Sequence, residues 1–106
     1  MKFEDAEKAL EYLKNTDEEA ARMRAHKDWL HEKKKTVIAI AAAESDEKSQ
    51  AGKEADAYRS QNYQTWLLNY KEAVADFEII RNQRASAALQ IEIWRSYNAN
   101  TRQGNV

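Results

Sequence analysis

The stretch Tyr63–Trp94 reads YQTWLLNYKEAVADFEIIRNQRASAALQIEIW and repeats an apolar pattern every seven residues. One series of the repeat contains Tyr63, Tyr70, Phe77, Arg84, Ile91 and Asn98, and the second, three residues later, contains Trp66, Ala73, Ile80, Ala87 and Trp94. Two such series form a seam along a helix that packs against another helix. Neither proline nor glycine occurs between Lys53 and Asn98. The pattern therefore predicts one unbroken helix over 53–98, about 69 Å long at 1.5 Å per residue.

The part of the chain before this helix predicts two further helices. Phe3, Ala6, Leu10 and Leu13 line one side of a short helix over 3–14. Asn15-Thr16 interrupts that pattern, and Thr16-Asp-Glu-Glu19 resembles a capping box, in which a hydroxyl and a glutamate cap the first turn of a helix. A second helix is then expected over 17–43. Its stripe contains Ala20, Met23, Leu30, Val37 and Ala41 and is interrupted by Lys27 and Lys34.

A polar segment, 44–52, separates this second helix from the long one. It ends in Gly52, one of only two glycines in the 106 residues, and proline is absent. A turn is therefore expected over 44–52, and a polar tail over 99–106. Strand patterns are nearly missing. The chain is predicted to be a single all-α domain, an elongated antiparallel helical hairpin with a short N-terminal helix and a long coiled-coil-like C-terminal helix.

Unequal helix lengths predict self-association. The second helix, about 40 Å long, is too short to cover the third. The uncovered end would expose Ile91 and Trp94 as an apolar patch, which a second copy could cover. A homodimer or a higher oligomer is therefore expected. The residues predicted for its interface are Tyr70, Phe77, Ile80, Ile91 and Trp94. A kink near 81–84 would instead allow a compact bundle.

Two polar residues occupy the seam, Arg84 and Asn98, and each has two interpretations. Polar residues at core-facing positions can fix the register or the oligomeric state. Alternatively, Arg84 extends from the edge of the seam to solvent or to a nearby carboxylate, and Asn98 belongs to a frayed helix end.

Several function classes are not expected. The absence of cysteine excludes disulfides and thiolate sites. His26 and His31 are five residues apart, on different sides of a helix, so they do not form a metal site. No glycine-rich phosphate loop or serine nucleophile motif is present. We therefore expect no enzyme, cofactor or small-molecule substrate, and, without an apolar membrane span or signal peptide, a cytoplasmic protein.

The charge of −1 conceals two basic blocks. Residues 21–35 carry six basic and two acidic side chains, and residues 81–106 carry four and one. Within these blocks, the residues that could contact nucleic-acid phosphates are Lys33, Lys34, Lys35, Arg81, Arg95 and Arg102. Alternatively, the basic blocks pair with acidic residues of the same chain, which suits the pI near 6.1. Trp29 and Tyr97 lie off the seam and are the aromatic residues best placed for exposed contacts.

Part of the chain also resembles a known group of proteins. The segments Ala57–Tyr63, Tyr70–Arg84 and Ile91–Asn100, the last of which begins Ile-Glu-Ile-Trp-Arg-Ser, resemble small helical proteins of tailed bacteriophages and prophages. The likeness covers about residues 53–102. It implies a bacterial host cell and a place beside phage replication or recombination proteins, but no catalytic residue.

Together these features predict a non-enzymatic oligomeric helical protein that acts through protein–protein contacts, an accessory or adaptor protein of phage type. Its partners would be further copies of itself or another phage or host protein. The alternative is a nucleic-acid-binding accessory protein that contacts phosphates without reading sequence. Salt distinguishes the two, because binding to phosphates releases counterions and weakens steeply as salt rises.

Overall fold

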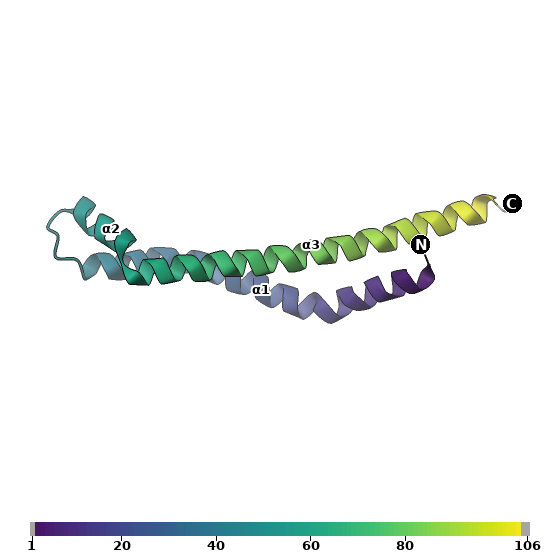
Figure 1. The fold of residues 1–106 in the computed structure, drawn as a ribbon, viewed down its shortest axis with the longest axis horizontal. Coiled ribbons are helices and arrows are strands. Elements are labelled where there is room, and N and C mark those ends of the chain that lie inside the picture. Colours follow the sequence, from purple (N-terminus) through teal and green to yellow (C-terminus); the bar gives the residue numbers. More distant parts are fainter. Residues whose placement is uncertain (1, 105–106) are drawn as a thin grey trace. The chain divides into compact units, whose positions relative to one another are not determined.

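The computed structural model describes residues 2–104 and contains three helices within this range (Figure 1). They are α1, Phe3–Ala43, α2, Gln50–Arg59, and α3, Gln61–Gly104. The described residues contain no strand. The all-α class, with a long C-terminal helix, is therefore confirmed.

The contacts of the chain divide into two units, each built from both long helices. The terminal unit combines Arg22 and the residues before it with Glu78 and the residues after it. The turn unit is Met23–Phe77 and includes α2. Within each unit α1 and α3 run antiparallel, as the contact pairs Leu30–Trp66 and Lys27–Phe77 show in the turn unit. The hairpin pairing of the two long helices is thus confirmed.

The predicted break at Asn15-Thr16 is wrong, because α1 is one helix of 41 residues. Thr16 does not cap a helix; its hydroxyl donates to the carbonyl oxygen of Tyr12, 2.7 Å away and one turn earlier. The seam of α1 also continues through this region. Its buried or half-buried residues are Ala6, Ala9, Leu13, Thr16, Ala20, Met23, Lys27, Leu30, Lys34, Val37 and Ala41. The two lysines thus occupy seam positions rather than interrupting the repeat.

The seam of α3 is confirmed residue by residue. Trp66, Ala73, Ile80 and Ala87 are all buried. The residues of the other series, together with Trp94, are half-buried. Alanine alternates with larger side chains along the buried series, which allows the helices to approach closely at the alanine positions.

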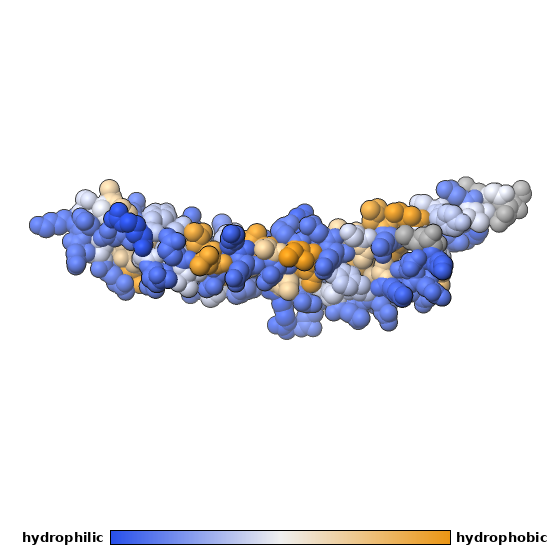
Figure 2. Space-filling model, viewed as in Figure 1, coloured by the Kyte–Doolittle hydropathy of each residue, from blue (hydrophilic) through white to orange (hydrophobic). Residues whose placement is uncertain are grey.

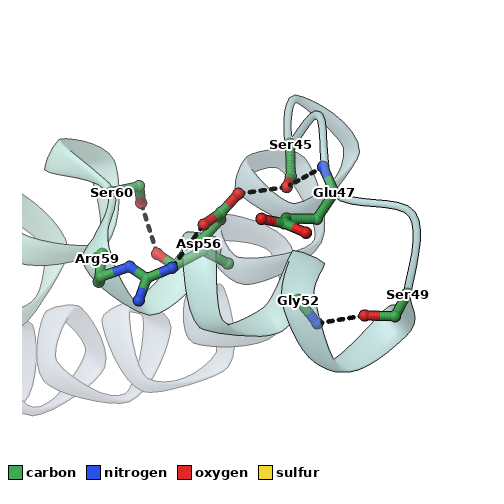
Figure 3. Close-up of polar contacts among 8 residues, drawn as sticks. Ser45, Glu47, Ser49, Gly52, Asp56, Arg59 and Ser60 are labelled. Carbon is green, nitrogen blue, oxygen red and sulfur yellow. Dashed lines mark hydrogen bonds and ion pairs between the residues drawn. The ribbon is translucent and has the colours of Figure 1, made fainter.

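The turn between α1 and α2 is shorter than predicted, because α2 begins at Gln50 and includes Gly52. Ser49 caps α2, and its hydroxyl accepts a hydrogen bond from the Gly52 N–H at 3.0 Å (Figure 3). No described glycine has a positive φ. A Cβ on Gly52 would lie only 3.0 Å from the Cβ of Glu47. Glycine is therefore suited to this position because it leaves space for the turn, and not because the backbone has a conformation that only glycine adopts.

The predicted unbroken helix over 53–98 is also wrong at Ser60, where α2 ends and α3 begins. The Ser60 hydroxyl donates to the Ala57 carbonyl oxygen at 2.6 Å and accepts from the Tyr63 N–H at 3.2 Å. The hydroxyl of one serine therefore bonds a backbone carbonyl at the end of α2 and a backbone N–H at the start of α3. The short side chain of serine favours such hydrogen bonds to the nearby backbone.

The C-terminal end of α3 extends to Gly104, so the predicted tail is helical over 99–104. Residues 105–106 of that prediction lie outside the described residues. Asn98 is half-buried within α3 and does not lie at a helix end. The alternative of a kink at 81–84 is wrong, because α3 continues through these residues. Among the described helices, none is long and apolar enough to cross a membrane.

Candidate interaction surface

The turn unit is held by a row of aromatic rings that α1 covers. Trp66 stacks between Tyr63 and Tyr70, with ring centroids 5.6 and 5.3 Å away. Its indole N–H donates to the carbonyl oxygen of Leu30 at 2.7 Å, so the buried nitrogen has a partner. Tyr70 also meets His31 of α1 through its hydroxyl, 3.3 Å from Nδ1. Trp66 therefore forms the core of the turn unit with Leu30 and Ala73, and half-buried Tyr63 and Tyr70 pack against this core.

In the terminal unit the N-terminal part of α1 covers the end of α3 that was expected to be exposed. The rings of Phe3 and Trp94 lie 5.3 Å apart. Ile80 is 5% exposed, and Ile91 is half-buried. The premise of an uncovered end is therefore wrong, because α1 is long enough to reach it. Of the predicted interface residues, all five lie on the seam that α1 contacts, and their role in association stays a prediction.

Arg84 is the polar residue at the centre of the terminal unit's seam. Its guanidinium donates to the carbonyl oxygen of Leu13 at 2.8 Å and to the hydroxyl of Thr16 at 2.7 Å. It also forms an ion pair with Asp17 at 3.1 Å. Arg84 thus lies on the seam and reaches a carboxylate of α1, so it pairs the two helices at one register.

On the side of α3 away from the seam, the terminal unit carries a second apolar series. Ile79, Leu89 and Ile93 are 57%, 60% and 48% exposed. Several exposed residues between these three are small or uncharged, namely Ala85, Ser86, Ala88 and Gln90. We call Ile79, Ala85, Ser86, Leu89 and Ile93 the outer stripe. Figure 2 shows apolar residues exposed on the C-terminal part of α3.

The sequence reasoning missed the outer stripe because it followed only the strongest repeat. A signal was present, but it was not distinctive. Seven residues in succession, 85–91, carry no charge in a chain of which 33% is charged, but longer uncharged runs occur at 36–43 and 60–70. Seven successive residues make about two helical turns and so cover every side of the helix. An uncharged run of this length therefore leaves part of the side facing away from the seam uncharged.

Two ion pairs flank the outer stripe. Arg81 pairs with Glu78 at 3.1 Å, and Arg95 pairs with Glu92 at 2.9 Å. Each pair joins residues three apart on α3, and all four side chains remain 44–66% exposed. The predicted phosphate-contacting residues Arg81 and Arg95 therefore have acidic partners on their own helix, although solvent still reaches both guanidiniums.

An exposed tryptophan of α1 in the turn unit has one lysine and one histidine against its ring. Trp29 is 54% exposed, as expected for an aromatic residue off the seam, and Tyr97 on α3 is 60% exposed. The Nζ atom of Lys33 lies 5.0 Å from the centre of the Trp29 ring, and His26 stacks on the same ring. Lys34 is half-buried, Lys35 is exposed, and Arg102 is exposed near the end of α3. The structure therefore does not gather Lys33, Lys34 and Lys35 on one side of α1.

The turn around α2 carries the most polar cluster of the turn unit (Figure 3). The Ser45 hydroxyl donates to the Asp56 carboxylate at 2.5 Å and accepts from the Glu47 N–H at 3.1 Å. The hydrogen bonds from Ser45 and then from Arg59 lower the pKa of Asp56. All these polar atoms are used to hold the turn. No group of three or more potential metal-ligating side chains occurs among the residues that the structure describes.

The comparisons with known proteins add no relative. No protein-family model matches the chain, and neither the curated proteins nor the solved structures contain a significant match to it.

Proposed function

We propose that the protein is a non-enzymatic helical protein that acts through protein–protein contacts and associates with further copies of itself. The observation that carries the proposal is the outer stripe. The seam of α3 already packs against α1, so the exposed Ile79, Leu89 and Ile93 are a second apolar surface on one helix. Helices with apolar residues on two sides usually pack against other protein surfaces on both of those sides.

A second copy is the partner that the surface suits best. The large residues of the outer stripe are apolar, and Ala85 and Ser86 between them have small side chains. Two identical helices can therefore approach closely at Ala85 and Ser86. The interface that we propose therefore differs from the seam residues predicted earlier. Substitutions at Ile91 or Trp94 would disturb the pairing of α1 with α3 before they affected association.

The setting of these contacts is part of the proposal. The resemblance of residues 53–102 to phage and prophage proteins supports a role as an accessory or adaptor protein in a bacterial cell, with a phage or host protein as a further partner.

The test is the solution mass of the full chain by light scattering at about 50 and 200 mM salt. Self-association through an apolar stripe predicts a dimer or larger species at both salt concentrations. A monomer at every concentration and at both salt levels would contradict the proposal.

A second candidate function is binding to nucleic acid, and one observation favours it. Exposed Trp29 has the ammonium group of Lys33 against its ring and the ring of His26 stacked on it, a combination of one cation and two aromatic rings that suits single-stranded nucleic acid. Repeating the mass measurement with a short single-stranded DNA tests this candidate. A mass increase that disappears between about 50 and 200 mM salt would favour it, and no change at 50 mM would exclude it for that DNA.

A further inference from the structure

A groove of about 380 Å³ runs between α1 and α3 in the turn unit, to one side of the seam. Trp29 and Lys33 of α1 line one wall, and Thr65 and Asn69 of α3 line the other. Buried Trp66 also lines the groove, and its indole N–H is already bonded to a carbonyl oxygen of α1. The groove therefore has a fixed apolar floor, an aromatic and cationic wall, and a wall of uncharged polar groups.

The antiparallel pairing of the helices sets which wall residues face each other. His31 of α1 meets Tyr70 of α3, and Trp29 and Asn69 lie only two and one residues from this contact. Along the helix axis, Trp29 and Asn69 are therefore within about one helical turn, 5.4 Å, of each other. One end of the groove thus combines an exposed indole ring with the amide of an exposed asparagine.

The next turn of each helix places a cation and a hydroxyl together. Lys33 follows Trp29 by four residues on α1, and Thr65 precedes Asn69 by four residues on α3. In an antiparallel pair these two steps run in the same direction in space, so Lys33 and Thr65 also lie at one level. The Nζ atom of Lys33 is 5.0 Å from the centre of the Trp29 ring, so the cation lies directly beside the aromatic end.

The groups at these two levels match the parts of a nucleotide. A base can stack on the Trp29 ring, and the Asn69 amide has both a donor and an acceptor for the edge of that base. The Thr65 hydroxyl accepts from Gln61 Nε2 at 3.2 Å, so its own hydrogen can be donated to a phosphate oxygen. Lys33 is the one charged residue among the described residues that line the groove, which favours an anionic occupant there.

Only an unpaired strand offers all of these parts together. In a duplex, neighbouring bases cover the face of each base and its partner occupies the edge, whereas an unpaired base presents both. An acidic side chain of a protein would match Lys33 but would bring no flat ring to Trp29.

We infer that this groove binds one nucleotide of a single-stranded nucleic acid, with the base between Trp29 and Asn69 and the phosphate at Lys33 and Thr65. The inference rests on the second candidate function, nucleic-acid binding, because it names the site and the strand type for that function. It does not depend on self-association.

Fluorescence anisotropy of a labelled single strand of about 12 deoxyadenosine nucleotides, added to the full chain at about 50 mM salt, tests the site. Trp29→Ala should weaken binding about tenfold, and Asn69→Ala about threefold or more. The matched controls are Tyr97→Ala and Asn82→Ala, because Tyr97 and Asn82 are exposed residues of α3 outside the groove. Each control should change the affinity by less than about twofold.

A strand of the same length without bases should bind about tenfold more weakly than the complete strand, because it keeps the phosphates and loses the stacking. Equal binding of the two strands would overturn the inference, since contacts to phosphates alone would explain it. Weaker binding by Trp29→Ala, with Asn69→Ala equal to Asn82→Ala, would overturn the groove but leave the second candidate function intact. No binding of either strand at about 50 mM salt would overturn both.

Discussion

At Arg84 a guanidinium stands where the repeat of α3 otherwise has an apolar or aromatic residue. It donates to Leu13 and Thr16 and pairs with Asp17, all on α1. Its side chain is 22% exposed, whereas that of Asp17 is 81% exposed, so the ion pair itself is partly screened by water. The hydrogen bonds to the Leu13 carbonyl and the Thr16 hydroxyl should therefore contribute more than the ion pair does.

Arg84→Ala is expected to lower the free energy of unfolding by about 1–3 kcal/mol, because hydrogen bonds from a charged donor are lost along with the packing of its stem. Chemical denaturation followed by circular dichroism measures the change. Arg22→Ala is the matched control, since Arg22 is exposed and forms its ion pair with Glu18 of its own helix, and it should change stability by about 0.5 kcal/mol or less. Equal losses for the two variants would contradict the role of Arg84.

Asp56 provides a pH-dependent contribution at the turn. Its pKa is lowered from 3.8 by hydrogen bonds from Ser45 and Arg59, so the folded state binds its proton more weakly than the unfolded state does. The stability that this carboxylate contributes is therefore complete above about pH 4 and is lost as the pH falls through the lower, folded-state pKa.

Asp56→Asn should accordingly melt at a lower temperature than the unmodified chain at pH 7. The difference in melting temperature should shrink as the pH falls below about 4, because both chains then lack the charge. Thermal melts of the two proteins from pH 2.5 to 7 measure it. A difference that stays constant over this range would show that the carboxylate charge contributes nothing to the turn.

At the level of the helices, the sequence predicted α3 well because its apolar repeat is long and regular. Each residue of the repeat from Tyr63 to Asn98 is buried or half-buried. The local signals at helix ends were less reliable. Thr16 has the neighbours of a capping residue, but pairing with α3 through Arg84 holds it inside a helix. Ser60 has no neighbouring glycine or proline to predict a break. Its extended backbone and its two side-chain hydrogen bonds show the break in the structure.

A substitution at Asn15 tests the continuity of α1. Asn15 is exposed in the middle of the helix. Asn15→Ala should therefore raise the free energy of unfolding by about 0.5 kcal/mol, and Asn15→Gly should lower it by a few tenths of a kcal/mol, following the helix propensities of these residues. Urea denaturation of the two variants measures both changes. Stabilisation by glycine and destabilisation by alanine would instead indicate a break in the helix at Asn15.

At the level of the whole molecule, the sequence predicted the all-α hairpin but wrongly took the end of α3 with Ile91 and Trp94 to be uncovered, while association through the seam residues stays a prediction. The error follows from the helix boundaries. A break in α1 left Ile91 and Trp94 without a cover, whereas the continuous helix brings Phe3 against Trp94. The outer stripe could not be separated from ordinary surface residues until the seam had been assigned to contacts within the chain.

The central claim is that the outer stripe of α3 carries self-association, and sedimentation equilibrium of Ile93→Lys tests it most directly. Ile40→Lys is the matched control, because Ile40 is a similarly exposed isoleucine on α1, 52% against 48%. We predict that Ile93→Lys weakens the dimer by about tenfold or more, since the apolar burial lost at two symmetric contacts exceeds about 1.4 kcal/mol. Ile40→Lys should leave the dimer unchanged. Equal dimerisation of both variants, with unchanged helix content, would contradict the claim.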